Sequence, residues 1–287
     1  MIDSVSADFD HEIPNGSRLY FGKSAQLKRE LENKASEILV KNGFSEILTP
    51  YFSYHQHLSV APQKLLKLSD PTNHELALRA DSTVDVVRIV RKRLKDDKLR
   101  RLFYVQPTFK YPSDEFYQIG AELIGEKNLP LAIKIAQEFF KEFDLMPALQ
   151  LSNIEIPKKI CEILNLPLEI FEKGKIETLL EQNLPWLDAT ARATSLKDVQ
   201  ALRVQVPEEL VPCLDEILNL GVDYEHICVS LLYYSKMRYY DALFFRFLDA
   251  GAVYCNGGNY EIDGLKSSGF ALLVDALIEK IMQKDEK

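Results

Sequence analysis

Apolar residues recur at helical spacing in the first part of the chain. Between Ser24 and Asn42 they fall three or four positions apart, on one face of a predicted helix: Leu27, Leu31, Ala35, Ile38 and Leu39. Ser24 is a suitable N-cap, and Gly43 suits the left-handed residue that often follows a helix. We therefore expect an amphipathic helix that begins near Ser24 and ends at Asn42.

Strand patterns dominate the middle and the later part of the chain. The clearest pair is 101–110 and 116–125, joined by a short loop with Pro112 and Asp114, which favours an antiparallel hairpin. Further short strands are predicted at 47–49, 76–80, 149–152, 227–234, 238–248 and 251–254, with Tyr260 continuing the last. Because hairpins outnumber β-α-β alternations, we expect an α+β fold with an antiparallel sheet flanked by helices.

Helical patterns return in three more places. Residues 131–140 predict one helix, and 155–220 read as short helices with five prolines and little strand signal. We interpret 155–220 as a small helical insertion between 1–154 and 221–287. A full helical stripe then predicts a C-terminal amphipathic helix: Phe270, Leu273, Val274, Leu277, Ile278 and Ile281.

Charge and cysteine content narrow the function classes. The 287 residues carry 35 Lys and Arg against 43 Asp and Glu, so a net charge of −8 argues against binding nucleic acid through a broad basic surface. No signal peptide is expected from the acidic segment 1–10, and no apolar run of about 18 residues predicts a membrane helix. The four cysteines form no CxxC pair, which favours reduced thiols in a cytoplasmic protein.

Common cofactor and metal motifs do not occur in the sequence. It has no P-loop, dinucleotide-binding, HExxH or GxSxG pattern, so no cofactor is expected. His55 and His57 would share one face of an extended segment, but no further ligands accompany them. We therefore expect no metal site.

Three local patterns suggest chemistry, and each has an ordinary structural alternative. Gln118 and Glu122 share a strand face with Gly120, which predicts either a polar pocket floor or a solvated sheet face. Four tyrosines around residues 233–240 predict either a pocket wall for a flat ring or the edge of an aromatic core. The pair Gly257-Gly258 predicts either a hairpin turn or a close backbone approach to a ligand.

Eight short motifs follow one another between residues 14 and 280. They are PNGSR at 14–18, GFSEILTP at 43–50, LRADST at 78–83, FYVQPTFKY at 103–111, FYQIGAE at 116–122, RYY at 238–240, GGNY at 257–260 and GFAL at 269–272. In this order they resemble the catalytic domain of histidyl-tRNA synthetase, a class II aminoacyl-tRNA synthetase. The segments 43–50, 103–111 and 269–272 resemble its motifs 1, 2 and 3. The resemblance implies the class II synthetase fold.

The resemblance also implies an amino-acid site. Residues matching the family's histidine-binding motifs are candidate ligands of histidine, a candidate small-molecule partner: Asp81, Thr83, Gln118, Glu122, Tyr239, Tyr240, Gly257 and Gly258. Asp81 is one methylene shorter than the family's glutamate, and Arg238 replaces an aspartate.

The nucleotide side departs further from the family. Its motif 2 arginine is Lys110 here, its motif 3 arginine falls at Asp275, and two further arginines fall at Ser235 and Asn259. Adenylation requires cations on the ATP phosphates, and lysine lacks the bidentate fork of arginine. We therefore expect Lys110 and Asp275 to mark a relic nucleotide site without catalytic residues. No anticodon-binding domain is expected in the chain.

A synthetase-like domain with these departures resembles the regulatory subunits of ATP phosphoribosyltransferase. The resemblance implies a non-catalytic protein that activates the short-form catalytic subunit and mediates histidine feedback in the first step of histidine biosynthesis. It further implies a hetero-oligomer built on a self-dimer through the motif 1 region. Two alternatives remain: a residual amino-acid-activating ligase, and a stand-alone amino-acid sensor.

Overall fold

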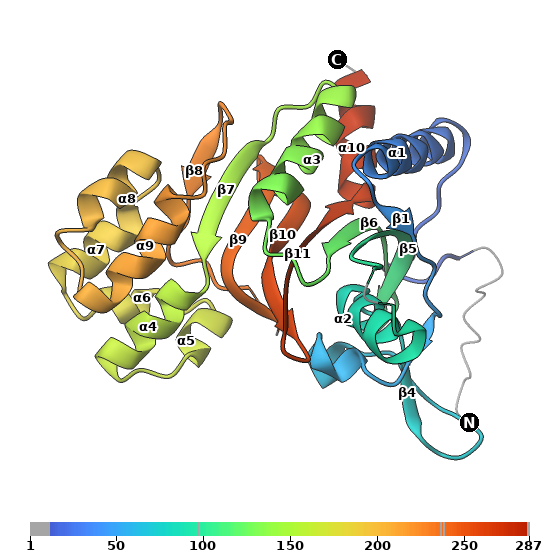
Figure 1. Cartoon of the computed structure of the whole chain (residues 1–287), viewed down its shortest axis with the longest axis horizontal. Helices are drawn as coiled ribbons and strands as arrows, with labels where there is room; N and C mark the ends of the chain where they lie inside the picture. The colour runs from blue at the N-terminus through green and yellow to red at the C-terminus, as the bar shows by residue number, and fades with distance from the viewer. Residues whose placement is uncertain (1–11, 97, 236, 238, 286–287) are drawn as a thin grey trace, which may run out of the picture.

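A single eight-stranded sheet organises the described part of the chain, which is residues 12–96, 98–235, 237 and 239–285 of a computed structural model (Figure 1). The strand order is β1-β5-β6-β11-β10-β9-β7-β8. Their bounds are Ser45–Glu46 (β1), Arg101–Lys110 (β5), Asp114–Leu123 (β6), Ala148–Asn153 (β7), Ile227–Val229 (β8), Tyr240–Asp249 (β9), Ala252–Ile262 (β10) and Leu265–Leu273 (β11). The edge pairs β1–β5 and β7–β8 are parallel and the pairs between them antiparallel, so the α+β expectation is confirmed with a mixed sheet.

The predicted hairpin forms the centre of one half of the sheet. β5 and β6 pair from Arg101 opposite Leu123 to Lys110 opposite Asp114. The second strand begins at Asp114, two residues earlier than expected, so the turn is only 111–113. The hairpin therefore places the polar face of β6 beside the face of β5 that lies on the same side of the sheet.

Three helices cover one face of the sheet (Figure 1): α1 (Gly22–Lys41), α3 (Leu129–Glu142) and α10 (Val274–Asp285). Their apolar stripes meet sheet residues such as Phe245 and Phe247 in the large core. α1 begins at Gly22, so Ser24 lies in its first turn and is not the N-cap, although its hydroxyl does accept from the Phe21 backbone N–H. The end at Asn42, followed by Gly43 at φ +83°, is confirmed.

Shorter elements cover the other face. They are η1 (Gln56–Leu58), η2 (Pro62–Lys64), the small sheet of β2 (Phe52–Ser53), β4 (Glu75–Leu78) and β3 (Lys67–Ser69), α2 (Thr83–Arg88) and η3 (Ile89–Leu94). Val86, Val87 and Val90 of α2 and η3 pack with Tyr104 and Tyr260 of the large sheet. This second core is small, and it leaves a pocket beside it.

Helices occupy the segment that the sequence marks as different in character. They are α4 (Glu155–Leu164), α5 (Glu169–Glu172), α6 (Glu177–Leu180), α7 (Pro185–Arg192), α8 (Leu196–Leu202), η4 (Glu208–Leu210) and α9 (Val211–Leu218). They lie together beyond β7 and β8 (Figure 1). Their buried apolar residues join the large core through contacts such as those of α9 with β7 and β9. The boundaries 155 and 220 stay a prediction.

Four predicted elements differ from the structure. Residues 47–49 are not a strand, and the strand expected over 227–234 ends at Val229. The C-terminal helix begins at Val274, because Phe270 and Leu273 belong to β11. β11 is a central strand covered on both faces, so apolar residues occupy both of its sides and imitate a helical stripe. The strand expected at 238–248 begins at Tyr240, and Arg238 lies outside the described residues.

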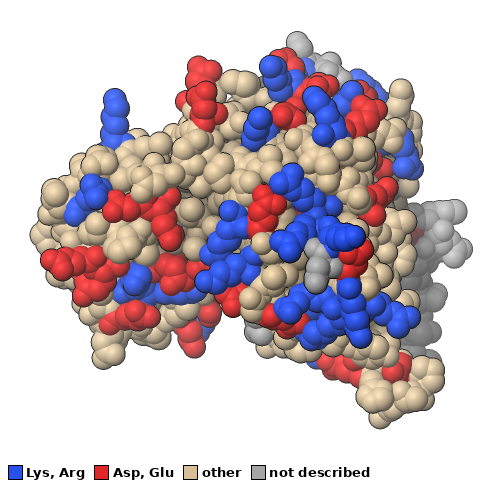
Figure 2. Space-filling model, in the orientation of Figure 1, with Lys and Arg blue, Asp and Glu red and all other residues tan. Residues whose placement is uncertain are grey.

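Cations gather on one part of the surface. Figure 2 shows them over α2 and η3, a segment that carries Arg88, Arg91, Lys92 and Arg93. Asp263 forms ion pairs with Arg88 at 3.2 Å and with Lys92 at 3.0 Å. Within the described ranges, no helix is both long and apolar enough to cross a bilayer.

Candidate functional site

A pocket of about 410 Å³ lies between the large sheet and the elements that cover its second face. Its lining comes from five strands of the sheet, from the start of α2 and from the segment before β9. Seven of the predicted site residues line it together: Asp81, Thr83, Lys110, Gln118, Glu122, Tyr239 and Tyr240. Residues that lie up to 159 positions apart therefore form one site, as the motif order predicted.

Glu122 is the chemical centre of the pocket. Its side chain is buried, with only 1% of the residue exposed, and three hydroxyls donate to its carboxylate. The donors are Thr83 at 2.8 Å, Tyr260 at 2.7 Å and Tyr104 at 3.4 Å. Burial nevertheless raises the pKa of Glu122 to about 8, and the nearby negative charge of Asp81 acts in the same direction.

Asp81 supplies a second buried carboxyl group. The Tyr239 hydroxyl donates to it at 3.0 Å, and burial raises its pKa to about 6. Lys110 is the only Lys or Arg among the described residues that line the pocket. The pocket is therefore rich in acceptors, and it suits a ligand that brings its own N–H donors or positive charge.

A glycine allows Glu122 to approach the neighbouring strand. Gly269 of β11 lies opposite Glu122 in the register of β11 with β6. A Cβ atom at Gly269 would overlap the Glu122 carboxylate, so only glycine leaves room for it. The motif 3 glycine thus shapes the pocket through the sheet.

Gln56 fixes the backbone that carries Asp81. Its Oε1 accepts from the N–H groups of Ala80 at 2.7 Å and Asp81 at 2.8 Å, and its Nε2 donates to the Asp81 carbonyl at 2.9 Å. Nε2 also donates to the Asp85 carboxylate at 2.7 Å, to which Ser53 donates from the other side. Gln56 and Ser53 belong to η1 and β2, so a surface segment is tied directly to the pocket.

Gly257 and Gly258 do not line the pocket, contrary to the prediction. Both lie inside β10 and form no turn. A Cβ at Gly257 would overlap the Phe245 ring, and one at Gly258 would lie 2.8 Å from Tyr240. The close approach that these glycines permit is to aromatic side chains of β9, not to a ligand.

Asp275 also lies outside the pocket lining. Its carboxylate accepts from the Tyr117 backbone N–H at 2.8 Å and from the Tyr20 hydroxyl. It therefore ties α10 to β6 and to the segment before α1. Lys110, in contrast, does line the pocket, with its ammonium 5.3 Å from the centre of the Phe116 ring. The two predicted relic residues are not brought together.

Sequence reasoning missed part of the aromatic wall. Phe116, Phe244 and Asn256 line the pocket beside Tyr233, whose ring stacks on Phe244 at 5.2 Å. Tyr233 belongs to the predicted tyrosine cluster. Phe116 begins the motif at 116–122 but was not singled out as a site residue, and the only signal for Asn256 is its position beside Gly257-Gly258.

The arrangement of acidic, histidine and cysteine side chains bears on metal binding. Across 12–96, 98–235, 237 and 239–285, no group of three or more His, Cys, Asp or Glu side chains is placed to hold a metal ion. Asp81 and Glu122 are engaged by hydroxyl donors and do not share a vacant centre.

Comparison with known proteins gives a consistent result. Residues 20–208 match the family model described as histidyl-tRNA synthetase. The ATP phosphoribosyltransferase regulatory subunit of Wolinella succinogenes is 43% identical over 96% of this chain and 98% of its own length. That of Helicobacter hepaticus is 32% identical over 95% and 99%. The crystal structure of an ATP phosphoribosyltransferase regulatory subunit/histidyl-tRNA synthetase from Bacillus halodurans is similar in fold, with a TM-score of 0.82 at 22% identity. The match covers 96% of this chain and 84% of that one.

Proposed function

Because the chain belongs to the family of ATP phosphoribosyltransferase regulatory subunits, which share the histidyl-tRNA synthetase-like fold, we propose that it activates the short-form catalytic subunit and transmits histidine feedback. Its role is regulatory and lies in histidine biosynthesis. The proposal concerns how that role is performed. Histidine binds the Glu122 pocket, and the occupied pocket changes the free energy of the assembly with the catalytic subunit.

The observation that carries this proposal is the pair of buried carboxyl groups. Histidine brings an ammonium group and an imidazole ring with N–H donors, and the pocket offers Asp81 and Glu122 within tyrosine walls. We assign the ammonium group to Asp81 and Thr83, and the imidazole to Glu122 and Tyr240. Gln118 completes the polar floor on the same face of β6.

The nucleotide side supports a subunit that does not adenylate. Lys110 is the one cation of the pocket lining within the described residues, and Asp275 is occupied by Tyr20 and Tyr117. Ser235 and Asn259, which fall at two arginine positions of the family, bring no charge. A triphosphate would meet one ammonium group and two buried carboxyls, which leaves its charge largely unbalanced.

Calorimetric titration of the chain with histidine, with and without ATP, tests the pocket. We expect saturable histidine binding that does not depend on ATP, and loss of that binding in Glu122→Gln but not in Glu261→Gln. Glu261 is an exposed residue one position beyond Tyr260 on β10, which makes it a matched control.

Other outcomes select other functions. ATP binding that strengthens with histidine, together with pyrophosphate release, would support the residual ligase. Histidine binding without any effect on the rate of the short catalytic subunit would support a stand-alone sensor. No binding of either ligand would contradict the pocket assignment.

We also propose a self-dimer through the motif 1 region. Leu48 of the motif 1 segment is exposed, and further large apolar residues are exposed in the segment 51–68 that follows it and at Tyr111, whose N–H donates to the Lys64 carbonyl. They are Leu48, Tyr51, Phe52, Tyr54, Leu58, Leu68 and Tyr111. A patch of this kind marks an interaction surface in a globular protein. We place the protein in the cytoplasm, because its four cysteines are free thiols.

A further inference from the structure

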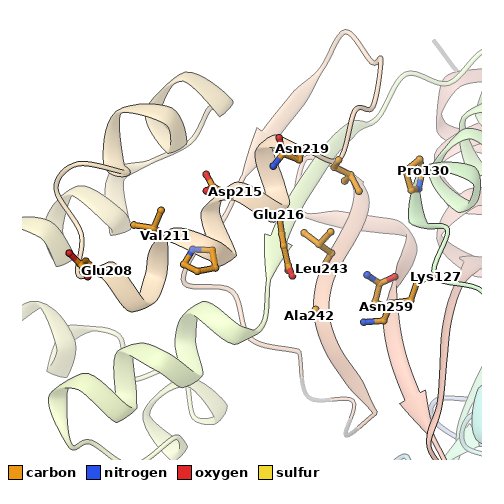
Figure 3. A pocket seen from close by; sticks show the side chains of 12 residues that line it. Lys127, Pro130, Glu208, Val211, Asp215, Glu216, Asn219, Ala242, Leu243 and Asn259 are labelled. Carbon is orange, nitrogen blue, oxygen red and sulfur yellow. The ribbon is translucent and has the colours of Figure 1, made fainter.

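A second cavity lies on the face of the sheet opposite the amino-acid pocket. It is a groove of about 860 Å³ between α9 and the start of α3, and β9 and β10 form its floor (Figure 3). Its volume is twice the 410 Å³ of the amino-acid pocket. The groove therefore suits a ligand considerably larger than an amino acid.

Asn259 places a hydrogen-bond donor in the floor of this groove. Ser268 donates to its Oδ1 at 2.7 Å. The next residue of the strand is Gly269, which lies against the Glu122 side chain. Neighbouring strand residues point to opposite faces, so Ser268 and Asn259 face away from the amino-acid pocket. In Figure 3 the Asn259 side chain extends into the groove.

The amide of Asn259 is fixed through its oxygen and opens to the groove through its nitrogen. The residue is 8% exposed, it lines the groove, and the bond from Ser268 to Oδ1 orients Nδ2. A carbonyl or carboxylate oxygen of a ligand can accept from Nδ2 in place of water. Lys127 provides a second donor in the lining, held 3.5 Å from the Asp241 carboxylate.

The wall of the groove opposite Asn259 and Lys127 carries acidic side chains. Three carboxylate residues of η4 and α9 line it, and two of them are held in place: Asp215 by Arg203 at 3.2 Å and Glu216 by the Asn153 amide at 2.8 Å. The third is Glu208, an exposed residue of η4. Arg203 balances the charge of Asp215, so Glu208 and Glu216 give this wall its net negative charge, which favours a cationic group and repels phosphates.

Apolar side chains line the groove between these walls. They are Pro130, Val211, Pro212, Leu220, Ala242 and Leu243. An apolar channel with carboxylates on one side and N–H donors on the other matches an extended peptide. Its apolar side chains enter the channel, a basic side chain faces η4 and α9, and its carbonyl oxygens accept from Asn259 and Lys127.

We propose that this groove binds an extended segment of the catalytic partner, one with apolar side chains beside a basic residue. The inference rests on the proposed function, because it requires that partner. It assigns to the helices of 155–220 a role that their sequence does not reveal: they supply one wall of the docking site.

The test measures complex formation between the full chain and the short catalytic subunit by calorimetry. Glu208→Lys reverses a charge of the groove wall, and Asn219→Trp fills the groove from the exposed end of α9. We expect each change to weaken binding roughly tenfold or more. Glu209→Lys is the matched control, since Glu209 is equally exposed on η4 but does not line the groove, and it should leave the affinity unchanged.

The outcomes separate the two proposals. If the unchanged chain forms no complex, the proposed function fails, and this inference fails with it. If the unchanged chain, Glu208→Lys and Asn219→Trp all bind equally, only the groove assignment is overturned. Equal weakening by Glu208→Lys and Glu209→Lys would show a general charge effect and would also overturn it. Histidine titration of each variant verifies that the fold is intact.

Discussion

Glu122 shows how one buried side chain sets the character of the pocket. Three hydroxyl donors surround it, yet burial dominates and its pKa is raised to about 8. The residue therefore holds a proton at neutral pH in the empty protein. A ligand with a cationic or N–H group favours the ionised form, so ligand binding and proton release are coupled.

This coupling predicts a pH-dependent stability. Glu122 keeps its proton in the folded state up to about pH 8, whereas the unfolded chain releases it above about pH 4.3. The stabilisation of the folded state by protonated Glu122 is therefore fully present below about pH 4.3 and is lost as the pH rises through about 8. We expect Glu122→Gln to lose less stability than the unchanged chain between about pH 6 and pH 9, by roughly 2–3 kcal/mol.

Chemical unfolding of both proteins at the two pH values measures this difference. Only the change between the two proteins is used, because groups remote from Glu122 cancel in that comparison. Parallel stability curves would contradict the assignment of a raised pKa to Glu122.

At the residue scale, the sequence predicted the hydrogen-bond acceptors of the pocket better than the roles of its glycines. Glu122 and Thr83 were identified from motifs, and the structure joins them by a hydrogen bond. Gly257 and Gly258 were predicted to belong to the site, but a glycine in a sequence indicates only that a larger side chain would not fit there. What fills that space, here Phe245 and Tyr240, depends on the register of β9 with β10, which no local pattern contains.

Among the elements, η1 is short but holds the pocket in place. Gln56 makes four hydrogen bonds, three of them to the backbone of residues 80 and 81 and one to Asp85. It is fully enclosed, so water cannot replace these bonds when the side chain is removed.

We expect Gln56→Ala to destabilise the chain by roughly 2–4 kcal/mol and to weaken histidine binding more than tenfold. The second effect follows because the backbone of Asp81 loses its support. Denaturant unfolding and calorimetry measure the two quantities. Gln63→Ala, at an exposed position of η2, is the control, and equal effects of both variants would refute the role of Gln56.

Elements could be predicted where turn or capping residues mark their ends. The β5–β6 hairpin and the end of α1 follow from such local patterns, and the structure confirms both, with β6 beginning two residues earlier than expected. The boundary between β11 and α10 could not be predicted, because Phe270 and Leu273 fit both a two-sided buried strand and a helix.

Across the whole molecule, exposed apolar surface is unevenly distributed. Leu48, in the segment 43–50 that resembles motif 1, is 74% exposed, and Phe52, two residues beyond that segment, is 56% exposed. Val204 is 90% exposed but lies alone at the end of α8, where a single apolar residue needs no partner.

We expect the double substitution Leu48→Asp and Phe52→Asp to convert a dimer into a monomer, because two charges would be buried without partners at the interface. Sedimentation velocity measures the mass. Val204→Asp should leave the dimer intact. A monomeric unchanged chain, or a double variant that still dimerises, would show that this patch is not the interface.

At the scale of the whole molecule, the positions of the elements relative to one another were the hardest feature to predict from the sequence. The motif order placed Asp81, Glu122 and Tyr239 in one pocket, but nothing in the pattern showed that Asn259 faces the opposite side of the sheet. That assignment needs the alternation of β10 and β11 together with the position of α9.

The bond from Tyr20 to Asp275 limits what one substitution at this position could do. By resemblance the motif 3 arginine of the synthetases falls here, while in this chain the carboxylate joins α10, β6 and the segment before α1. An Asp275→Arg substitution would break both of these contacts and set a cation against the Tyr117 N–H. Its first effect would therefore be lost structure, not a new phosphate contact.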